Sequence, residues 1–322
     1  MATVNQRLRA VQMLVLANAC WGLSFPTAKA LALLQEPLWP ESSSWFVASS
    51  TLAIRFGLAA VVMLALCLRS LRQFSGLELW QGAGLGVFAA AGLVFQMDGL
   101  AYTSASTSAF LTQFYCLTIP IWVAIAERRW PSRITIASCL MVIAGVAFLS
   151  RIDWRQLHIG RGELETLVGS VIFTGQILWL QRPRFAGTNV NHFTLVMFVV
   201  IALCCLPVAA VTQGAGDSLA AGYRTPAAWL CLGLLTGFCT LGGYLLMNHW
   251  QPCITATQAG LIYCLEPVFA SLFAFFLPAW FSTLAGIGYS NETFGWSLLL
   301  GGGLITAANV LIQLASRPRD PA

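Results

Sequence analysis

Three charged residues interrupt long apolar stretches of this sequence, where an unpaired charge requires an explanation. Lys29, the only lysine in the chain, lies in WGLSFPTAKALALL, Arg55 lies in LAIRFGLAA, and Glu266 lies in AGLIYCLEPVFASLFAF. Lipid solvates ionisable groups poorly, so such residues in membrane segments usually face the interior of a helix bundle or a water-filled cavity. The three residues therefore indicate a polar site or pathway within an apolar bundle.

Prolines beside these charges predict where helices weaken. Pro267 directly follows Glu266, and Pro26 precedes Lys29 by about one helical turn. Pro120 occupies a similar position in the stretch FYCLTIPIW. Proline has no amide hydrogen, so each one leaves the carbonyl group four residues earlier without its helical hydrogen bond. Helices interrupted near the middle of the membrane form the binding sites of many secondary transporters, so we predict helix-breaking or gating roles for these prolines.

Lys29 has two interpretations. It lies about five residues, or roughly 7–8 Å, before the predicted outer end of its helix, so its side chain could extend to the lipid headgroups. Gly22 and Pro26, however, share a helical face with Lys29, and glycine and proline favour a packed interior face over a lipid-exposed one. We therefore predict that Lys29 faces the pathway.

Arg55 and Glu266 also leave alternatives open. Asp98 is the acidic residue nearest to Arg55 in predicted depth, so a fixed Arg55–Asp98 ion pair agrees with the sequence as well as contact with a substrate does. Glu266 lies near the middle of its predicted helix. It could bind a proton and couple proton binding to helix movement, or it could be a neutral acid that donates a hydrogen bond to a freed carbonyl. We favour the second role.

The remaining candidates are aromatic and polar side chains within the apolar segments. Aromatic surfaces with a few polar groups suit an organic solute better than an inorganic ion. The predicted pathway residues of this kind are Trp21, Gln96, Gln113, Tyr115, Gln176, Trp179, Tyr244, Asn248 and Tyr263. Some of them are expected only to hydrogen-bond to neighbouring helices.

The elements that position these residues are predicted to be membrane-spanning helices. Hydrophobic residues make up 58% of the chain and charged residues only 9%, whereas a soluble domain carries about 25% charged residues. Apolar runs long enough to cross a bilayer recur along the whole length. We predict an all-α integral membrane protein with ten transmembrane helices, near residues 10–34, 47–69, 79–100, 105–126, 132–150, 163–181, 192–213, 226–247, 254–280 and 294–315.

The distribution of arginine predicts the orientation of these helices, because cytoplasmic segments of membrane proteins carry an excess of arginine and lysine. With the N-terminus in the cytoplasm, the inner segments contain Arg7, Arg9, Arg69, Arg72, Arg128, Arg129, Arg133, Arg182, Arg184, Arg317 and Arg319. The outer segments contain Arg151, Arg155, Arg161 and Arg224. We therefore predict that both termini are cytoplasmic.

The chain contains an internal repeat. ASTSAFLTQFYCLTIPIW, residues 105–122, resembles TATQAGLIYCLEPVFA, residues 255–270, and Pro120 matches Pro267. A repeat of this kind predicts that the two matching helices occupy equivalent places in two halves of the structure.

The repeat divides the chain into halves at residues 1–150 and 151–322, each with five predicted helices. An odd number of helices gives the two halves opposite orientations, as in the inverted repeats of many secondary transporters. The second half contains additional residues near 279–294, which we predict to lie outside and to cover the outer mouth.

Five stretches can be compared with a known family: WGLSFPTAK, LAIRFGLAA, LAYTSASTSAFLTQFYCLTIPIW, AERRWPSRITIASCLMVIAGVAFL and AGLIYCLEPVFASLFAF. They resemble the EamA-type members of the drug/metabolite transporter (DMT) superfamily. The resemblance implies a permease that moves amino acids, their derivatives or other metabolites, often outward across the bacterial inner membrane. The sequence departs from the family at Ile119, where members usually have an acidic residue before the proline.

We expect a secondary transporter, with export of an amino acid or derivative as the best candidate activity, working by alternating access. A membrane-embedded enzyme would need a nucleophile–base pair or a metal cluster, and a helical scaffold would not need Lys29 and Glu266 exposed to water. The histidines stand apart and the cysteines show no C-x-x-C spacing, so no metal or cofactor is predicted. The expected partners are a small-molecule substrate and membrane lipid, with proton coupling as an option and no nucleic acid.

Overall fold

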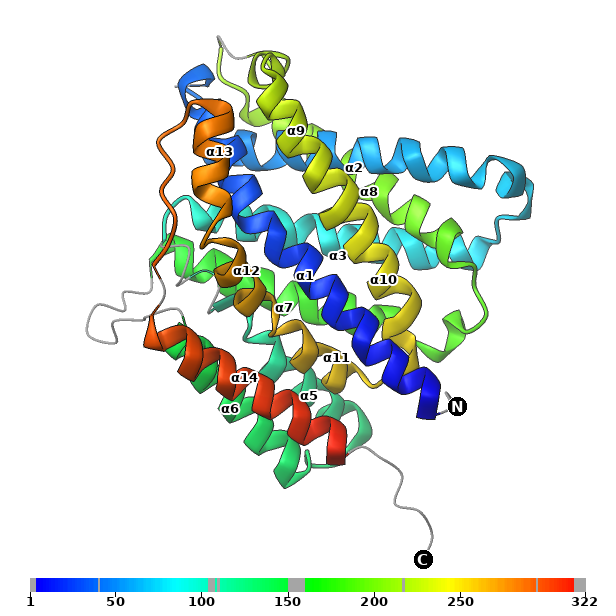
Figure 1. Cartoon of the computed structure of the whole chain (residues 1–322). Helices are drawn as coiled ribbons and strands as arrows, with labels where there is room; N and C mark the ends of the chain where they lie inside the picture. Colours follow the sequence, from blue (N-terminus) through cyan, green and yellow to red (C-terminus); the bar gives the residue numbers. More distant parts are fainter. Residues whose placement is uncertain are drawn as a thin grey trace, which may run out of the picture.

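The computed structural model describes residues 4–39, 41–103, 108, 111–149, 160–215, 218–293 and 295–315, and this part of the chain consists of helices, turns and irregular segments without a strand. The prediction of an all-α protein is confirmed for these residues. Figure 1 shows the helices and the positions of the two termini.

The longest helices are α1 (Val4–Gln35), α2 (Ser44–Cys67), α3 (Gly76–Leu100), α7 (Arg161–Leu180), α8 (Val190–Thr212) and α14 (Trp296–Ala315). The shorter ones are α5 (Tyr115–Glu127), α6 (Arg133–Leu149), α9 (Pro226–Leu234), α10 (Gly243–Trp250), α11 (Ala256–Tyr263), α12 (Glu266–Phe273) and α13 (Leu277–Ala285). The π-helix η5 (Leu235–Gly242) joins α9 to α10. Short 3₁₀ turns occupy Glu36–Leu38, Leu68–Gln73, Pro183–Phe185, Ala221–Tyr223 and Gln251–Cys253.

Polar side chains define where several helices begin. The Ser75 hydroxyl accepts a hydrogen bond from the Glu78 backbone N–H at 3.2 Å, and the Glu78 carboxylate accepts one from the Ser75 N–H at 3.0 Å. Thr255 and Gln258 form the same reciprocal arrangement at the start of α11. These capping boxes satisfy amide groups that the first helical turn leaves free.

The two segments that contain Pro120 and Pro267 are interrupted, but each break precedes its proline. Turns at Gln113–Phe114 and Cys264–Leu265 lie directly before α5 and α12. Pro267 thus falls in the first turn of α12, where its missing amide hydrogen leaves no helical bond unmade. α1 continues through Pro26, so no interruption occurs there.

Six helical stretches of the described chain are long and apolar enough to cross a membrane: Asn5–Leu38, Ser44–Gln73, Gly76–Leu100, Val190–Thr212, Pro226–Cys253 and Ala256–Phe273. Shorter apolar helices occupy Tyr115–Glu127, Arg133–Phe148 and Leu299–Ile312. The protein is therefore a multi-pass membrane protein.

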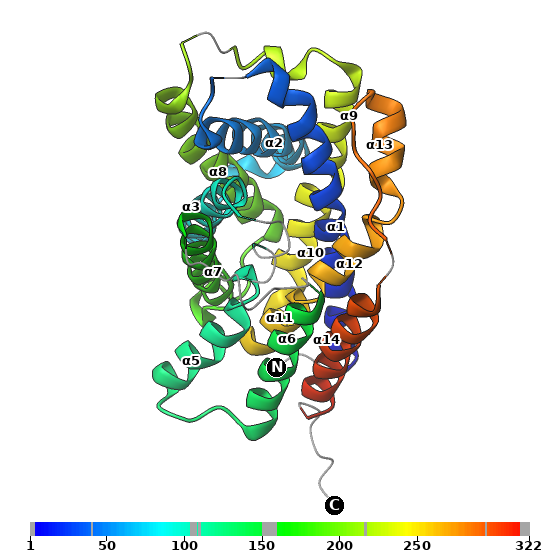
Figure 2. The ribbon, with the colours of Figure 1, turned by 90° about the vertical axis from the view of Figure 1, so that its left-hand side faces the viewer.

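The helices form two facing groups with a smaller group at one end. In Figure 2, α2, α3, α7 and α8 lie on one side, and α1, α9, α10 and α12 lie on the other. Within the first group α2 packs against α8, and α3 packs against both α7 and α8. Within the second group α1 packs against α9, η5, α10 and α12. Helices α6 and α14 pack against each other, beside α5 and α11.

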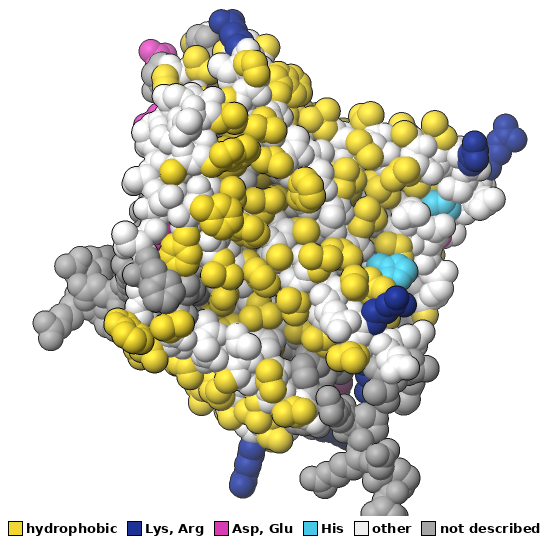
Figure 3. Space-filling view, in the orientation of Figure 1, with side chains coloured by type: hydrophobic (Ala, Val, Ile, Leu, Met, Phe, Trp, Pro, Cys, Tyr) yellow, Lys and Arg dark blue, Asp and Glu magenta, His cyan; other side chains and the backbone are white. Residues whose placement is uncertain are grey.

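The outer surface is largely apolar. Figure 3 shows hydrophobic side chains spread over the middle of one face, while the lysine and arginine side chains lie at its edges. Leu58, Leu203 and Trp229 are examples of large apolar side chains that this surface exposes. An apolar face with charges at its margins is what a bilayer requires of the protein that spans it.

The predicted outer insertion near 279–294 is a folded element. It begins within α13, which packs against α1, and Phe281 of α13 is fully buried. The chain then returns to α12, where the Glu292 N–H donates to the Ala274 carbonyl at 2.9 Å. The predicted ninth helix, 254–280, is correspondingly too long, because α12 ends at Phe273.

Candidate functional site

Glu266 lies in the first turn of α12 and faces the interior of the bundle. Its charge acts electrostatically on Tyr115, Cys239 and Tyr244, all of which are buried. The carboxylate itself is half-buried and has no hydrogen bond or ion pair to the described part of the chain. Glu266 is therefore an interior acid without a partner among the described residues.

Arg55 of α2 approaches the same region from the opposite group of helices. Its Nε donates to the Thr240 hydroxyl at 2.5 Å, and its guanidinium carbon lies 5.6 Å from the centre of the Phe56 ring. Its charge acts on Cys239 and Tyr244, the residues that Glu266 also reaches. Among the described residues, the two terminal nitrogens of the guanidinium have no hydrogen-bond partner and no ion pair. The opposite charges of Arg55 and Glu266 therefore share two neighbours without pairing with each other.

The π-helix η5 supplies the partner of Arg55. Thr240 and Cys239 both belong to it and are fully buried. A π-helix widens one turn of a helix and is frequent at functional sites, because the extra residue redirects side chains. Sequence reasoning missed this element, since LTGFCTLGG continues the apolar run of its helix without a proline.

Trp21 of α1 adds an aromatic surface to this region. Its ring lies edge-on to those of Tyr244, at 5.6 Å between centroids, and Tyr263, at 5.3 Å. The indole Nε1 is buried and has no acceptor among the described residues. The Tyr263 hydroxyl donates to Gln251 Oε1 at 2.8 Å, which fixes this tyrosine at the end of α11. Three predicted pathway residues, Trp21, Tyr244 and Tyr263, thus lie together.

The residues around the first helix break lie nearby. The Tyr115 hydroxyl donates to Gln113 Oε1 at 2.8 Å, and both side chains are buried. Gln96 Nε2 of α3 donates to the Thr112 hydroxyl at 3.0 Å. α5 contacts α11, so the two interrupted segments of the repeat meet inside the bundle. The charge of Glu266 acts electrostatically on Tyr115.

Three predicted residues lie in other environments. The Trp179 Nε1 donates to the Gln81 carbonyl at 3.1 Å, and its ring packs between α3 and α7. Asn248 Nδ2 donates to the Thr194 hydroxyl at 2.9 Å, which ties α10 to α8. The side chain of Gln176 is buried within α7, and its Nε2 has no acceptor in the described part of the chain. The first two contacts are those of helix packing.

Lys29 lies away from the Arg55–Glu266 region. Its side chain is exposed, and its Nζ lies 5.4 Å from the centre of the Tyr289 ring, in the segment that returns from α13. Burial, followed by the nearby Glu292 carboxylate, raises the pKa of Tyr289 to about 12. The only lysine of the chain is therefore associated with the insertion rather than with the interior acid and arginine.

Asp98 does not pair with Arg55. Its Oδ2 lies 2.7 Å from Nη2 of Arg161, at the start of α7, and the same guanidinium binds Glu165 Oε1 at 2.8 Å. Asp98 is completely buried and also accepts a hydrogen bond from the Ser44 hydroxyl. The predicted alternative of an Arg55–Asp98 ion pair is wrong, because Asp98 pairs with Arg161 instead. The sequence analysis placed Arg161 in an outer segment.

A nucleophile, a base and an acid do meet at another end of the bundle, although no sequence motif indicated it. His192 Nδ1 lies 2.9 Å from Glu78 Oε2, and its Nε2 lies 2.9 Å from Ser70 Oγ. The Ser70 hydroxyl donates to the Cys67 carbonyl at 3.1 Å, so its proton points away from His192. The array thus ties together the ends of α2, α3 and α8.

Within the described residues, no group of three or more His, Cys, Asp and Glu side chains could hold a metal ion.

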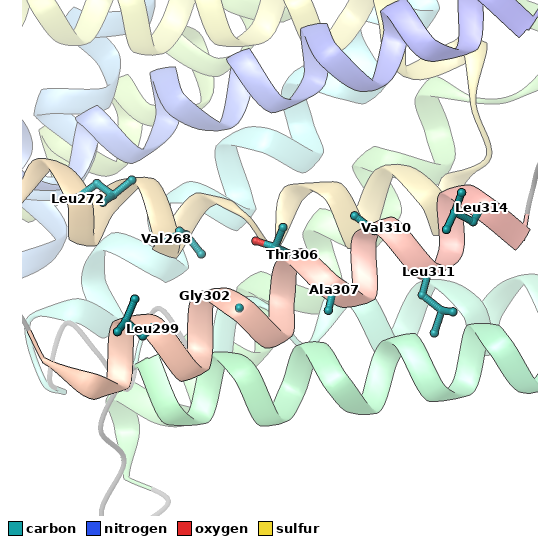
Figure 4. A pocket seen from close by; sticks show the side chains of 10 residues that line it. Val268, Leu272, Leu299, Gly302, Thr306, Ala307, Val310, Leu311 and Leu314 are labelled. Carbon is teal, nitrogen blue, oxygen red and sulfur yellow. The ribbon is translucent and has the colours of Figure 1, made fainter.

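A groove of about 800 Å³ runs between α12 and α14. Figure 4 shows its apolar lining, with Val268 and Leu272 on one side and Leu299, Val310 and Leu314 on the other. Val268 follows Glu266 by two residues, so the groove lies on a different face of α12 from the interior acid. The groove is therefore separate from the candidate site.

Comparison with known proteins agrees with this architecture. The EamA-like transporter family matches residues 8–151. A relative from Archaeoglobus fulgidus, described as an uncharacterized transporter, is 26% identical over 306 residues, which cover 95% of this chain and 88% of that protein. A protein of known crystal structure with 15% sequence identity aligns with a TM-score of 0.70 over 97% of this chain and 98% of its own, so the two share a fold. Residues 8–151 are thus an EamA-family domain, which confirms the resemblance carried by the four sequence motifs in the first half of the chain.

Proposed function

We propose that this protein is a secondary transporter of the drug/metabolite transporter superfamily that moves a small organic metabolite, an amino acid or derivative, by alternating access. The EamA domain and the transporter name of the relative support transport as the activity. The observation that carries the proposal is a pair of opposite charges inside a membrane protein, Arg55 beside a π-helix and Glu266 beside a helix break, both of which act electrostatically on the buried Tyr244.

The proposal includes ten membrane spans in two inverted five-helix repeats, residues 1–150 and 151–322. In such a fold, the second and seventh spans lie across the symmetry axis from each other, as do the fifth and tenth. The contacts of α2 with α8 and of α6 with α14 support this arrangement. A second pair of contacts also supports it. In the first half α3 packs against α7 and α8 of the second half, and the equivalent segment of the second half, α9–η5–α10, packs against α1 and α2 of the first.

The break between α11 and α12 is the proposed moving part. Two short helices joined by a turn can change their relative angle without breaking helical hydrogen bonds, which makes such a turn a natural hinge. Movement at Cys264–Leu265 would carry Glu266 relative to Arg55, because Arg55 is held by η5 on another helix. The same movement would couple to a proton if Glu266 binds one, whereas a neutral hydrogen-bonding Glu266 would leave transport independent of pH gradients.

The proposed setting is the inner, or plasma, membrane, with both termini in the cytoplasm and transport directed outward. Arginine enrichment of the predicted inner segments supports the orientation. In this arrangement Lys29 and the α13 segment stand at the outer entrance, and Arg55 and Glu266 form the central site. Gln96, Gln113, Tyr115, Trp21 and Tyr263 line the approach to it.

Uptake into proteoliposomes tests the proposal. Purified protein would be reconstituted, and a panel of labelled amino acids and related metabolites would be offered with and without a pH gradient. We expect saturable uptake of at least one compound above that of empty liposomes. A dependence on the pH gradient that disappears in Glu266→Gln, with exchange preserved, would assign proton coupling to Glu266. Uptake of none of the panel by correctly folded protein would contradict the proposal.

A further inference from the structure

We infer that the turn between α7 and α8 binds the phosphate of an anionic phospholipid, through Arg182 and Arg184 held against a platform of aromatic rings. The turn contains the 3₁₀ segment η3 (Pro183–Phe185), which follows α7 and contacts α3. The distribution of arginine predicts that this turn is cytoplasmic. The inference goes beyond the proposed transport function and does not depend on it.

The aromatic platform consists of Trp80 of α3, Trp179 of α7 and Phe185 of η3. Trp179 Nε1 donates to the Gln81 carbonyl at 3.1 Å, which fixes this ring against α3. Trp80 and Phe185 each lie 5.7 Å from Trp179 between ring centroids. Phe185 is buried, whereas 55% of Trp80 is exposed. The platform is therefore anchored in the protein and open on the side of Trp80.

Both arginines of the turn lie against this platform. The guanidinium carbon of Arg182 is 4.1 Å from the centre of the Trp179 ring, and that of Arg184 is 5.2 Å from the same ring. Arg184 also lies 4.8 Å from the centre of the Phe185 ring and 5.8 Å from that of Trp80. Contact with a ring orients a guanidinium group, while its N–H groups lie in its own plane and stay available as donors.

The two guanidinium groups have no acidic partner in the described part of the chain. Neither forms an ion pair or a side-chain hydrogen bond there, and both side chains are exposed. Glu78, in the first turn of α3, already binds His192 and the backbone N–H groups of Ser75 and Asn189. The positive charge of the turn is therefore uncompensated, and a guanidinium group binds phosphate through paired N–H donors.

The surface beside the turn favours a lipid over a free phosphate. α3 and α7 pack against each other (Figure 2). Val87 lies about two turns from Trp80 on α3, Val168 lies about three turns from Trp179 on α7, and both valines are exposed. Apolar side chains thus continue from the platform along both helices, where acyl chains would lie. Tryptophan is enriched at the level of the headgroups, and basic side chains there attract anionic lipids.

Lipid binding to the purified protein tests the inference. The protein in a neutral detergent would be titrated with phosphatidylglycerol or with the zwitterionic phosphatidylcholine, and bound lipid would be counted by native mass spectrometry. We expect preferential binding of phosphatidylglycerol. The double variant Arg182→Gln/Arg184→Gln should bind it about 10- to 30-fold more weakly, the loss expected for two basic side chains. Equal binding of the two lipids by the wild type, or unchanged binding by the double variant, would overturn the inference.

Arg129 and Arg133 provide a matched control for the loss of charge. Both are exposed and belong to a predicted inner segment, but among the described residues neither lies over a ring. The double variant Arg129→Gln/Arg133→Gln should therefore bind phosphatidylglycerol nearly like the wild type. Equal losses in the two double variants would show a general attraction between charges and would overturn the assignment to the turn.

Two further measurements test the platform and the lipid. Trp80→Ala keeps both arginines and should weaken phosphatidylglycerol about two- to fivefold, with unchanged melting in the absence of lipid. Unchanged lipid binding by Trp80→Ala would contradict the role of the rings. Glycerol 1-phosphate carries a phosphate without acyl chains and should fail to displace the bound lipid. Displacement by an equal concentration of glycerol 1-phosphate would show a site for free phosphate instead.

Discussion

At the scale of single residues, the charges within apolar stretches could be recognised from the sequence, but their partners could not. Arg55 and Thr240 are separated by 185 positions, and nothing local marks Thr240 as a partner. Asp98 illustrates the same limit, because depth alone suggested Arg55 while the folded chain brings Arg161 to it. Matching by depth ignores rotation about the helix axis, and that rotation decides which side chains meet.

The Ser70–His192–Glu78 array should stabilise the ends of α2, α3 and α8. Replacing His192 with Phe removes the side-chain hydrogen-bond partner of the buried Glu78 carboxylate, which keeps its bonds to the Ser75 and Asn189 backbone, at a cost of about 1–3 kcal/mol. We therefore expect His192→Phe to lower the melting temperature in detergent clearly. The exposed His249 provides the control, and His249→Phe should melt close to the wild type. Equal melting of the two variants would show that the array contributes no stability.

The phenol of Tyr289 should ionise at a higher pH than that of a free tyrosine. Burial and the Glu292 carboxylate favour its neutral phenol and raise its pKa to about 12 in the folded protein, against about 10 for a free tyrosine. Its contribution to stability is therefore complete below about pH 10 and is lost as the pH rises through the folded pKa. In an ultraviolet titration, the difference between the wild type and Tyr289→Phe reports the phenolate of Tyr289. Its midpoint should lie about two pH units above that of a free tyrosine. A midpoint near that of an exposed tyrosine would contradict the packing of this segment against α1.

At the scale of elements, the packing of α1 against α12 positions Glu266 and depends on a glycine. A Cβ atom at Gly22 would lie 2.5 Å from Phe269 Cβ and 2.8 Å from the Ala270 nitrogen. Both distances are too short, and the backbone of α12 cannot move aside without shifting Glu266. The sequence indicated this face of α1 through Gly22 and Pro26, although it could not identify α12 as the neighbour.

Gly22→Ala should consequently destabilise the protein by about 1–3 kcal/mol, the usual cost of overpacking. It should also weaken ligand binding, because α12 carries Glu266. Gly57 of α2 is the control, since a Cβ atom there would meet nothing within 4 Å. Thermal melting of the two variants checks the contact: Gly57→Ala should match the wild type, and unchanged melting of Gly22→Ala would show that α1 and α12 are not in close contact.

The interrupted helices were only partly predictable for a physical reason. Proline marks positions that cannot donate a helical hydrogen bond, so Pro120 and Pro267 pointed to the right segments. The chain turns before each proline instead. Pro267 then lies in the first turn of α12, where it leaves no helical bond unmade, whereas Pro120 lies inside α5. The π-helix had no such marker, since its backbone differs from an α-helix only in which carbonyl each amide binds.

At the scale of the whole molecule, hydrophobicity and length predicted the all-α membrane architecture, because a bilayer imposes both on any helix that crosses it. The site was harder to predict, because its residues come from α1, α2, η5, α10 and α12, and their meeting depends on packing between the two groups of helices. The motifs that carried the family resemblance contained Arg55 and Glu266 but gave no information about their relative position.

Side-specific labelling tests the proposed topology. In a variant lacking the native cysteines, single cysteines would replace the exposed residues Glu41 and Gly288, predicted outside, or Gln73 and Ala186, predicted inside. An impermeant maleimide added to intact cells should label the first pair only, and opened vesicles should allow labelling of the second. Labelling of Glu41→Cys and Gln73→Cys from the same side would contradict the proposed arrangement of α2.

Counterflow in proteoliposomes tests the central claim most directly, since it requires only that a binding site be open to each side in turn. Vesicles loaded with an unlabelled amino acid that the purified protein binds would be diluted into the same labelled compound, for the wild type, Arg55→Gln, Glu266→Gln and the control Arg72→Gln. We predict rapid exchange in the wild type and in Arg72→Gln, and exchange reduced about tenfold or more in the other two. Undiminished exchange in both Arg55→Gln and Glu266→Gln would contradict the assignment of the transport site to the place where α2 and α12 meet.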